Sequence, residues 1–384
     1  MKRKELIRGS KLGISTVAIV VVVVVIIVIA AAAGYFFLTS PTSTTTSTTS
    51  TSSTTQQTTS TSPTNVKFGL SVAITIEYLP EYIAAHGGFW AQQGLNVTLT
   101  PFQGDGAHMQ GVSAGEVSIG EASYVGELNA ISKGVPIKAV AMGLQQADMI
   151  LIVGNNSHYT DASQLKGATI GVTTAGSATD MMFHLLAQHY NYTIGTDIHE
   201  LAVGGLTAQL AALTTNKTQG FFWTYETGYQ LQTKGDAKIL LFMSSIIPNW
   251  AENTIYATNS LISSNPTLVQ KVLQGVYNAI AYMTANKTYA TVEAEQYLGL
   301  TPAAANLTMN EAFSSGQFST NGAFDPAIVS GMNTARSLML ALNISSSLVP
   351  VDQSYTTQFV PVTAQNVSPS LMAIPRLMVD TEDS

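Results

Sequence analysis

Residues 165–190 read LKGATIGVTTAGSATDMMFHLLAQHY, and this stretch decides the fold class. A short apolar run at 168–173 predicts a strand, and a helical stretch that opens at Ala175-Gly176-Ser177 runs on to Tyr190. The same alternation of short apolar runs and helical stretches extends from Val66 to Phe242. Strands that alternate with helices imply a parallel sheet with right-handed crossovers, so the sequence predicts an α/β protein.

The alternation occurs in two successive sets, which suggests two lobes with a ligand cleft between them at the strand ends. Expected strands are 66–70, 96–100, 117–120 and 137–142, then 168–173, 200–203, 219–223 and 238–242. Expected helices are 79–93, 108–114, 123–133, 177–190, 206–215, 225–233, 266–286, 290–298 and 326–342. Segments 149–153 and 254–258 are expected to cross between lobes. Lobe 1 then comprises 66–148 plus 259–384, and lobe 2 comprises 149–258.

A membrane anchor is expected ahead of the lobes. Residues 1–13 are basic, and the apolar residues 14–38 are long enough to cross a bilayer as a transmembrane helix. The basic flank keeps Met1 cytoplasmic and places the body outside the cell, on a single-pass protein of the cell membrane. A secretory signal cleaved near Gly34 is the competing interpretation. The start also resembles pilin-like signals of archaeal surface binding proteins, which would be cut after Gly13.

Residues 39–64 are almost entirely Ser, Thr, Gln and Pro. They lack apolar residues to seed a core, so we expect a disordered linker, either an O-glycosylated stalk or an unmodified spacer. Asn-x-Ser/Thr triplets along the body are consistent with an exported glycoprotein. The expected acceptors are Asn96, Asn155, Asn191, Asn216, Asn286, Asn306, Asn343 and Asn366.

Composition excludes several classes. The chain has no cysteine, so disulfides and thiol chemistry are absent, and its net charge of −7 argues against nucleic acid as a partner. Charged residues make up only 10% of the chain, well below the usual ~25%. An acidic habitat, where carboxylates are neutral, is one physical account of this scarcity.

Ordered short motifs resemble the nitrate/sulfonate/taurine-type solute-binding proteins, which are related to thiamine-pyrimidine synthases. They include VKFGL at 66–70, YIAAHGGFW at 82–90, AGEVSIG at 114–120, LKGATIGV at 165–172 and FWTYE at 222–226. The resemblance covers Val66 to about Phe242. It implies a two-lobed periplasmic-binding-protein fold with two crossover segments. It also implies that the chain is an extracellular binding protein, not an enzyme, which passes a small organic solute to an ABC permease.

Helix N-termini offer free N–H groups to ligands, so we expect the loops at 104–107 and 175–179 to bind solute, unless they are ordinary caps. Arg336 and Arg376 are the only arginines of the body and lie far from these loops in the sequence. Carboxylates beside aromatic side chains instead suit an amine or a nitrogen heterocycle such as a thiamine pyrimidine precursor; a taurine-type sulfonate is the other candidate solute. The candidate ligand-binding residues are Ser71, Tyr78, Gly104, Asp105, Gly106, Ala107, Glu121, Ala122, Ser123, Tyr124, Thr174, Gly176, Ser177, Ala178, Thr179, Asp180, Trp223 and Glu226.

No metal site or cofactor is expected. Asp180 and His184 share a helix face, but two ligands are too few for zinc. His108 lies near Asp105 in the sequence and could act as an acid or a base, but no nucleophile accompanies it. The alternative function is an enzyme on the same fold, related to thiamine-pyrimidine synthesis, although that family carries a cysteine-rich motif that this chain lacks. A glycosylated surface-layer protein is a further alternative, which the strand–helix repetition disfavours.

Overall fold

The computed structural model describes residues 62–247, 250–366 and 368–369. The described residues belong to one compact unit, which contains all the elements below. The expected anchor at 14–38, and the expected linker apart from its last three residues, lie outside the described residues. Within the described part of the chain, no helix is both long and apolar enough to span a bilayer.

The first of two five-stranded sheets has the order β2-β1-β3-β10-β4. Its strands are β1 (Thr64–Leu70), β2 (Leu95–Pro101), β3 (Ile119–Ser123), β4 (Ile137–Leu144) and β10 (Asn253–Thr258). Strand β1 pairs in parallel with β2 and β3. Strand β10 is antiparallel to both β3 and β4. We call this sheet and the helices that cover it the first lobe.

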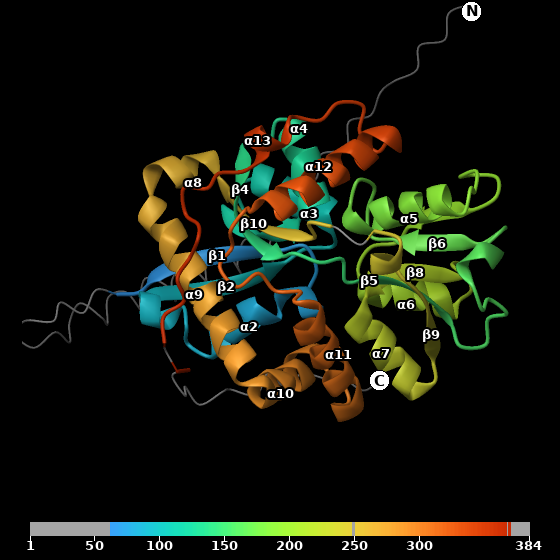
Figure 1. Ribbon diagram of the computed structural model, residues 1–384, viewed down its shortest axis with the longest axis horizontal. Helices are drawn as coiled ribbons and strands as arrows, with labels where there is room; N and C mark the ends of the chain where they lie inside the picture. The colour runs from blue at the N-terminus through green and yellow to red at the C-terminus, as the bar shows by residue number, and fades with distance from the viewer. Residues whose placement is uncertain (1–61, 248–249, 367, 370–384) are drawn as a thin grey trace, which may run out of the picture. The chain divides into compact units, whose positions relative to one another are not determined.

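The second sheet repeats the arrangement in the order β7-β6-β8-β5-β9 (Figure 1). Its strands are β5 (Met149–Gly154), β6 (Thr169–Val172), β7 (His199–Ala202), β8 (Gly220–Thr224) and β9 (Ala237–Phe242). Strand β6 is parallel to β7 and β8, while β5 is antiparallel to β8 and β9. This sheet, with its helices, is the second lobe.

The sequence predicted wholly parallel sheets, and this prediction is wrong for one strand in each sheet, β10 in the first and β5 in the second. The antiparallel strands β5 and β10 are the ones that enter a sheet from the other lobe. The parallel strands of both sheets end where the lobes meet, so a strand that arrives from there must run in the opposite direction. The expected crossing segments at 149–153 and 254–258 coincide with β5 and β10.

Helices cover both sheets. The first lobe carries α2 (Leu79–His86), α3 (Asp105–Ser113), α4 (Tyr124–Ser132), α8 (Asn259–Ser264), α9 (Pro266–Ala285), α10 (Lys287–Leu298), α12 (Pro326–Ala341) and α13 (Val351–Ser354). The second carries α5 (Ala178–His189), α6 (Leu206–Thr214) and α7 (Tyr225–Lys234). Helix α11 (Pro302–Ser315), which the sequence pattern missed, packs against α7. Short 3-10 turns include η1 (Ile76–Tyr78) and η2 (Ala91–Gln93).

Local chemistry explains these bounds. Helix α9 buries Val269, Val272, Leu273, Val276 and Ile280, the spacing of one apolar face. Burying each such side chain contributes about 1.5–3 kcal/mol. The predicted helix at 79–93 instead stops at His86, because Gly87 and Gly88 follow and Gly88 adopts a φ of 74°.

Candidate ligand-binding site

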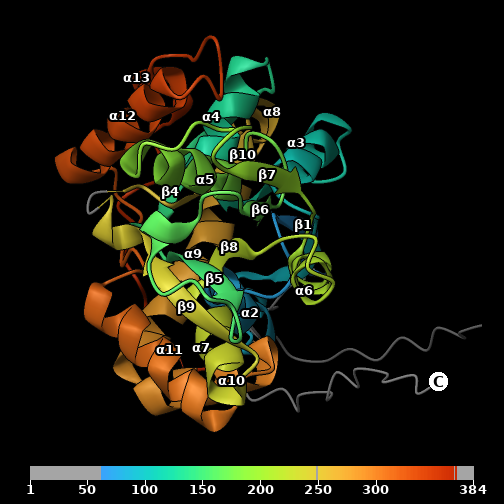
Figure 2. The same ribbon diagram turned by 90° about the vertical axis from the view of Figure 1, so that its right-hand side faces the viewer.

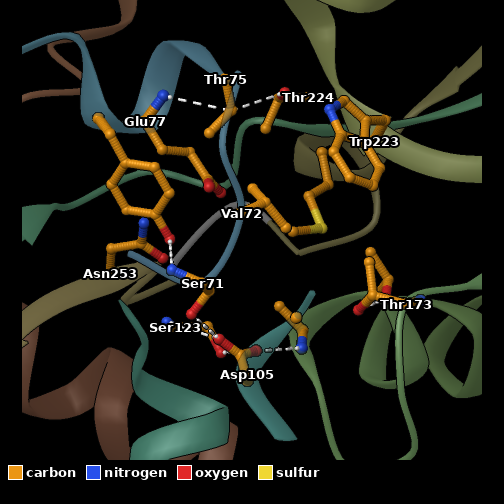
Figure 3. Close-up of a pocket in the computed structure, with 15 residues that line it drawn as sticks. Ser71, Val72, Thr75, Glu77, Asp105, Ser123, Thr173, Trp223, Thr224 and Asn253 are labelled. Carbon is orange, nitrogen blue, oxygen red and sulfur yellow. Dashed lines mark hydrogen bonds between the residues drawn. The ribbon is translucent and has the colours of Figure 1, made fainter. Parts of the chain in front are cut away.

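A cavity lies where the strands of both sheets end, between the two lobes (Figure 3). Its lining is Ser71, Val72, Thr75, Glu77, Tyr78, Gly104, Asp105, Ser123 and Asn253 from the first lobe, and Met149, Thr173, Ala178, Thr179, Trp223 and Thr224 from the second. The cavity volume is about 40 Å³. By the same measure, a single water molecule needs about 10–15 Å³. The lobes are therefore closed, with room for a few atoms.

Asp105 is the centre of the polar wall (Figure 3). Its Oδ1 accepts from the Ser71 hydroxyl at 2.6 Å, and its Oδ2 accepts from the Ser123 hydroxyl at 2.6 Å. The backbone N–H groups of Ser123 (3.4 Å) and Ala178 (3.1 Å) also donate to it. Because Ala178 begins α5, a carboxylate of the first lobe occupies the positive end of a second-lobe helix.

Other contacts hold the lobes together. The hydroxyls of Thr75 and Thr224 lie 2.9 Å apart, and the Gly106 N–H donates to the Thr174 hydroxyl at 3.4 Å. Gly104 permits this approach, since its φ is 106° and a Cβ there would lie 3.1 Å from the Cβ of Thr173. Closure thus joins α3 and the residue before η1 in the first lobe to the loop after β6, the start of α5 and the last residue of β8 in the second.

Several of the amides that we expected to bind solute are engaged within the protein in this closed state. Ala178 donates to Asp105, Gly106 donates to Thr174, and the Gly176 N–H donates to Asp180. Ser177 caps α5 by accepting from the Asp180 N–H at 3.3 Å, which is the ordinary capping role left open above.

His108 does have a hydroxyl neighbour, contrary to expectation. Its Nδ1 lies 3.1 Å from the Ser71 Oγ, and its Nε2 lies 2.7 Å from the Tyr256 hydroxyl. Ser71 gives its proton to Asp105, so it accepts from Nδ1–H, and Nε2 is left to accept from Tyr256. Burial lowers the pKa of His108 to about 3. The ring is therefore a neutral link in a hydrogen-bond chain.

Two donors at the cavity lack a protein partner. The Trp223 Nε1 and the Asn253 Nδ2 are buried and form no hydrogen bond. Leaving such a donor unpaired costs about 1–3 kcal/mol, so these two groups mark where a ligand would bind. The Glu77 side chain reaches toward the cavity in Figure 3. Burial raises the pKa of Glu77, and the nearby side chain of Asn253 opposes that rise.

Behind the cavity, Glu77, Asp148 and Glu252 place one carboxylate oxygen each within 4.8 Å of one another. Burial raises the pKa of all three, and the neighbouring carboxylates raise it further. Only Asp148 has a side-chain partner, the amide of Gln317 at 2.7 Å. Burial likewise raises the pKa of Glu226, to about 7. Asp148 and Glu252 directly precede the crossover strands β5 and β10. Burial favours the neutral, protonated form of all four carboxyls.

Eight of the 18 predicted residues line the cavity, namely Ser71, Tyr78, Gly104, Asp105, Ser123, Ala178, Thr179 and Trp223. The structure places the other ten outside the lining, and their part in binding stays a prediction: Gly106, Ala107, Glu121, Ala122, Tyr124, Thr174, Gly176, Ser177, Asp180 and Glu226. Sequence reasoning missed Val72, Thr75, Glu77, Met149, Thr173, Thr224 and Asn253. Most of these directly adjoin a strand end, which is the signal that would have found them.

The eight expected glycosylation acceptors are all exposed. Exposure makes each asparagine accessible, and modification itself stays a prediction.

Comparison with known proteins supplies the family. The family model described as NMT1/THI5 like matches residues 75–290. The riboflavin-binding protein RibY of Chloroflexus aurantiacus is 23% identical over 307 residues, covering 77% of this chain and 86% of that protein.

Solved structures share the fold. The alkanesulfonate-binding protein SsuA of Xanthomonas axonopodis pv. citri, bound to MOPS, has a TM-score of 0.66 at 15% identity, covering 77% of this chain and 99% of that one. The desulfurization enzyme DSZB has a TM-score of 0.56 at 14% identity, covering 77% and 97%. With two mixed sheets, two crossovers and a cavity between lobes, the chain has the α/β periplasmic-binding-protein fold and belongs to the NMT1/THI5-like family.

Proposed function

We propose that this protein is the extracellular solute-binding component of an ABC importer and that it closes two lobes on a small organic solute. The observation that carries the proposal is the inter-lobe cavity, which is lined by two unpartnered donors, Trp223 Nε1 and Asn253 Nδ2, and by the Glu77 carboxyl. A ligand pocket places a few polar groups where a solute can pair with them. The fold and the binding proteins among its relatives support it.

The solute is a nitrogen heterocycle or an amine rather than a sulfonate. No Lys or Arg lines the cavity, so nothing there offsets the charge of an anion. Glu77 requires a donor or a cation, while Trp223 and Asn253 require acceptors. A ring that carries both kinds of group, stacked near Tyr78 and Trp223, satisfies all three.

Binding requires the lobes to open. A cavity of about 40 Å³ does not hold a ring system. Opening breaks the contacts of Asp105 with Ala178 and of Thr75 with Thr224, each a modest cost of about 0.5–1.5 kcal/mol. A solute that contacts both lobes offsets that cost in the closed complex. Binding proteins close around their ligands by such a hinge motion.

The test is calorimetry on the full-length chain with three probes: riboflavin, a 4-aminopyrimidine and taurine. We expect a heterocycle to bind and taurine not to bind. A cationic ring nitrogen in the complex would favour the ionised form of Glu77. Glu77→Gln should therefore weaken heterocycle binding by about 1.5–3 kcal/mol, the usual value for a hydrogen bond to a charged group. The exposed Glu116→Gln is the matched control. Tight taurine binding that Glu77→Gln leaves unchanged would overturn the assignment.

The partners follow from this role. The closed body is expected to dock on membrane permease subunits, with residues 14–38 holding it at the cell surface and 39–64 as a spacer. Loss of uptake on deletion of 14–38, with solute affinity retained, is the expected result.

An enzyme is the second candidate, because Ser71, His108 and Asp105 lie together at the cavity wall. The hydrogen bonds run the wrong way for catalysis, since Ser71 donates to Asp105 and His108 donates to Ser71. A general base needs a pKa near the working pH, and that of His108 is about 3. Turnover of a bound heterocycle that is abolished by Ser71→Ala would favour the enzyme.

A further inference from the structure

A second polar cluster lies in the second lobe, outside the cavity lining. Asp180 and His184 come from α5, and Glu200 comes from the edge strand β7, which lies beside that helix in Figure 2. The His184 Nε2 is 3.3 Å from the Asp180 Oδ1 and 4.0 Å from the Glu200 Oε2. One ligand atom from each residue lies within 4.8 Å of the others. The fold thus brings Glu200 to the Asp180–His184 pair, which alone offers too few ligands for a metal ion.

The spacing fits a metal ion. Zinc bonds to His nitrogen and carboxylate oxygen at about 2.0–2.2 Å, so ligands on a tetrahedral ion lie roughly 3.3–3.6 Å apart. The distance between Asp180 and His184 has this value. The Glu200 Oε2, 4.0 Å from the His184 Nε2, must come closer to both other ligands, and its side chain, 24% exposed, has room to move.

An ion pair alone accounts poorly for the cluster. The Asp180 Oδ1 is buried and forms no hydrogen bond, although a ring nitrogen lies 3.3 Å away. Its Oδ2 accepts from the Gly176 N–H, which fixes the carboxylate so that Oδ1 faces His184. Such an outer hydrogen bond orients a metal ligand.

We propose that Asp180, His184 and Glu200 bind a divalent transition-metal ion of the zinc class. Three protein ligands leave one position of a tetrahedral ion for water, and the partial exposure of His184 and Glu200 gives that position access to solvent. The ion would join α5 to the edge strand of its sheet. Helix α5 begins at the cavity wall, so the metal would hold the solute-binding loop in place. The site is independent of which solute binds.

The test uses the full-length chain without an affinity tag, stripped with a chelator and titrated with Zn²⁺ at pH 7. Co²⁺ absorption then reports the coordination. We expect one equivalent to bind and to raise the unfolding temperature. His184→Ala and Glu200→Gln should each weaken binding at least about tenfold. The control His189→Ala changes an exposed histidine on the same helix and should leave binding unchanged.

Three results would overturn the proposal: no stoichiometric uptake, equal loss in His184→Ala and His189→Ala, or binding that survives both site variants and disappears in Glu252→Gln. The last would place the ion among the carboxyls behind the cavity. Matching unfolding temperatures of the metal-free variants and wild type ensure that lost binding reflects lost ligands.

Discussion

Glu226 predicts how stability responds to pH. The side chain is 1% exposed at the start of α7, and burial raises its pKa from 4.5 to about 7. Between these values the folded state keeps the proton and the unfolded state releases it, so the unfolded state binds fewer protons. The free energy of unfolding then falls as the pH rises. This contribution is fully present below about pH 4.5 and is lost by about pH 7.

The magnitude follows from the shift. One pKa unit corresponds to about 1.36 kcal/mol, so the rise in the pKa of Glu226 is worth about 3 kcal/mol across this window. Glu226→Gln removes the titration and keeps an acceptor for the Thr224 hydroxyl, which donates to Glu226 Oε1 at 2.5 Å. The difference in slope between wild type and variant isolates the effect, because any constant cost of the new amide cancels.

Urea unfolding at several pH values from 4 to 7.5 measures this slope. Wild type should lose about 3 kcal/mol more than Glu226→Gln over the window, whereas the exposed Glu116→Gln should follow wild type. A wild-type stability that is flat or rises from pH 4.5 to 7, or equal slopes for wild type and Glu226→Gln, would refute the reasoning.

Three further predictions concern the cavity and the anchor. Trp223→Ala should weaken solute binding by about 1–3 kcal/mol by calorimetry, while the exposed Lys133→Ala should leave affinity unchanged. Gly104→Ala should lower the unfolding temperature, because the backbone there has a φ of 106°. Alanine adopts such a conformation at a cost of about 1–2 kcal/mol. An unchanged unfolding temperature would contradict this strain. The mature protein should keep residues 14–38 and fractionate with membranes, and a wholly soluble form that begins beyond Tyr35 would contradict the anchor.

Local signals predicted most elements. Gly94 and Gly235 adopt left-handed conformations where helical turns were expected to end, and Ser177 caps α5 as its place before an apolar run suggests. Strand direction was not predictable in this way. Alternating strands and helices indicate parallel pairing, and only the path between lobes reverses β5 and β10.

The cluster of buried carboxyls was also beyond local reasoning. Glu77 occupies a short turn between a strand and a helix, and acidic side chains are usually exposed. It lies beside Asp148 and Glu252, which directly precede the two crossover strands far along the chain. Among the described residues ten of the chain's 23 acidic side chains are buried, and no Lys or Arg is. Burial raises the pKa of eight of these ten, so the fold favours their neutral forms. An acidic habitat, which would favour the same forms, stays a prediction.

The start of α5 shows why a helix N-terminus in the sequence does not by itself predict the charge of the ligand. Gly176-Ser177-Ala178 opens a helix, and the positive end of a helix ordinarily attracts an anion. Here the chain supplies that anion itself, because Asp105, 73 residues earlier, accepts the Ala178 N–H. An anionic solute would have to displace this carboxylate and then lie beside it, whereas a donor or a cation gains from both Asp105 and Glu77. The proposed preference for a donor or a cation therefore depends on a contact between lobes that no local motif encodes.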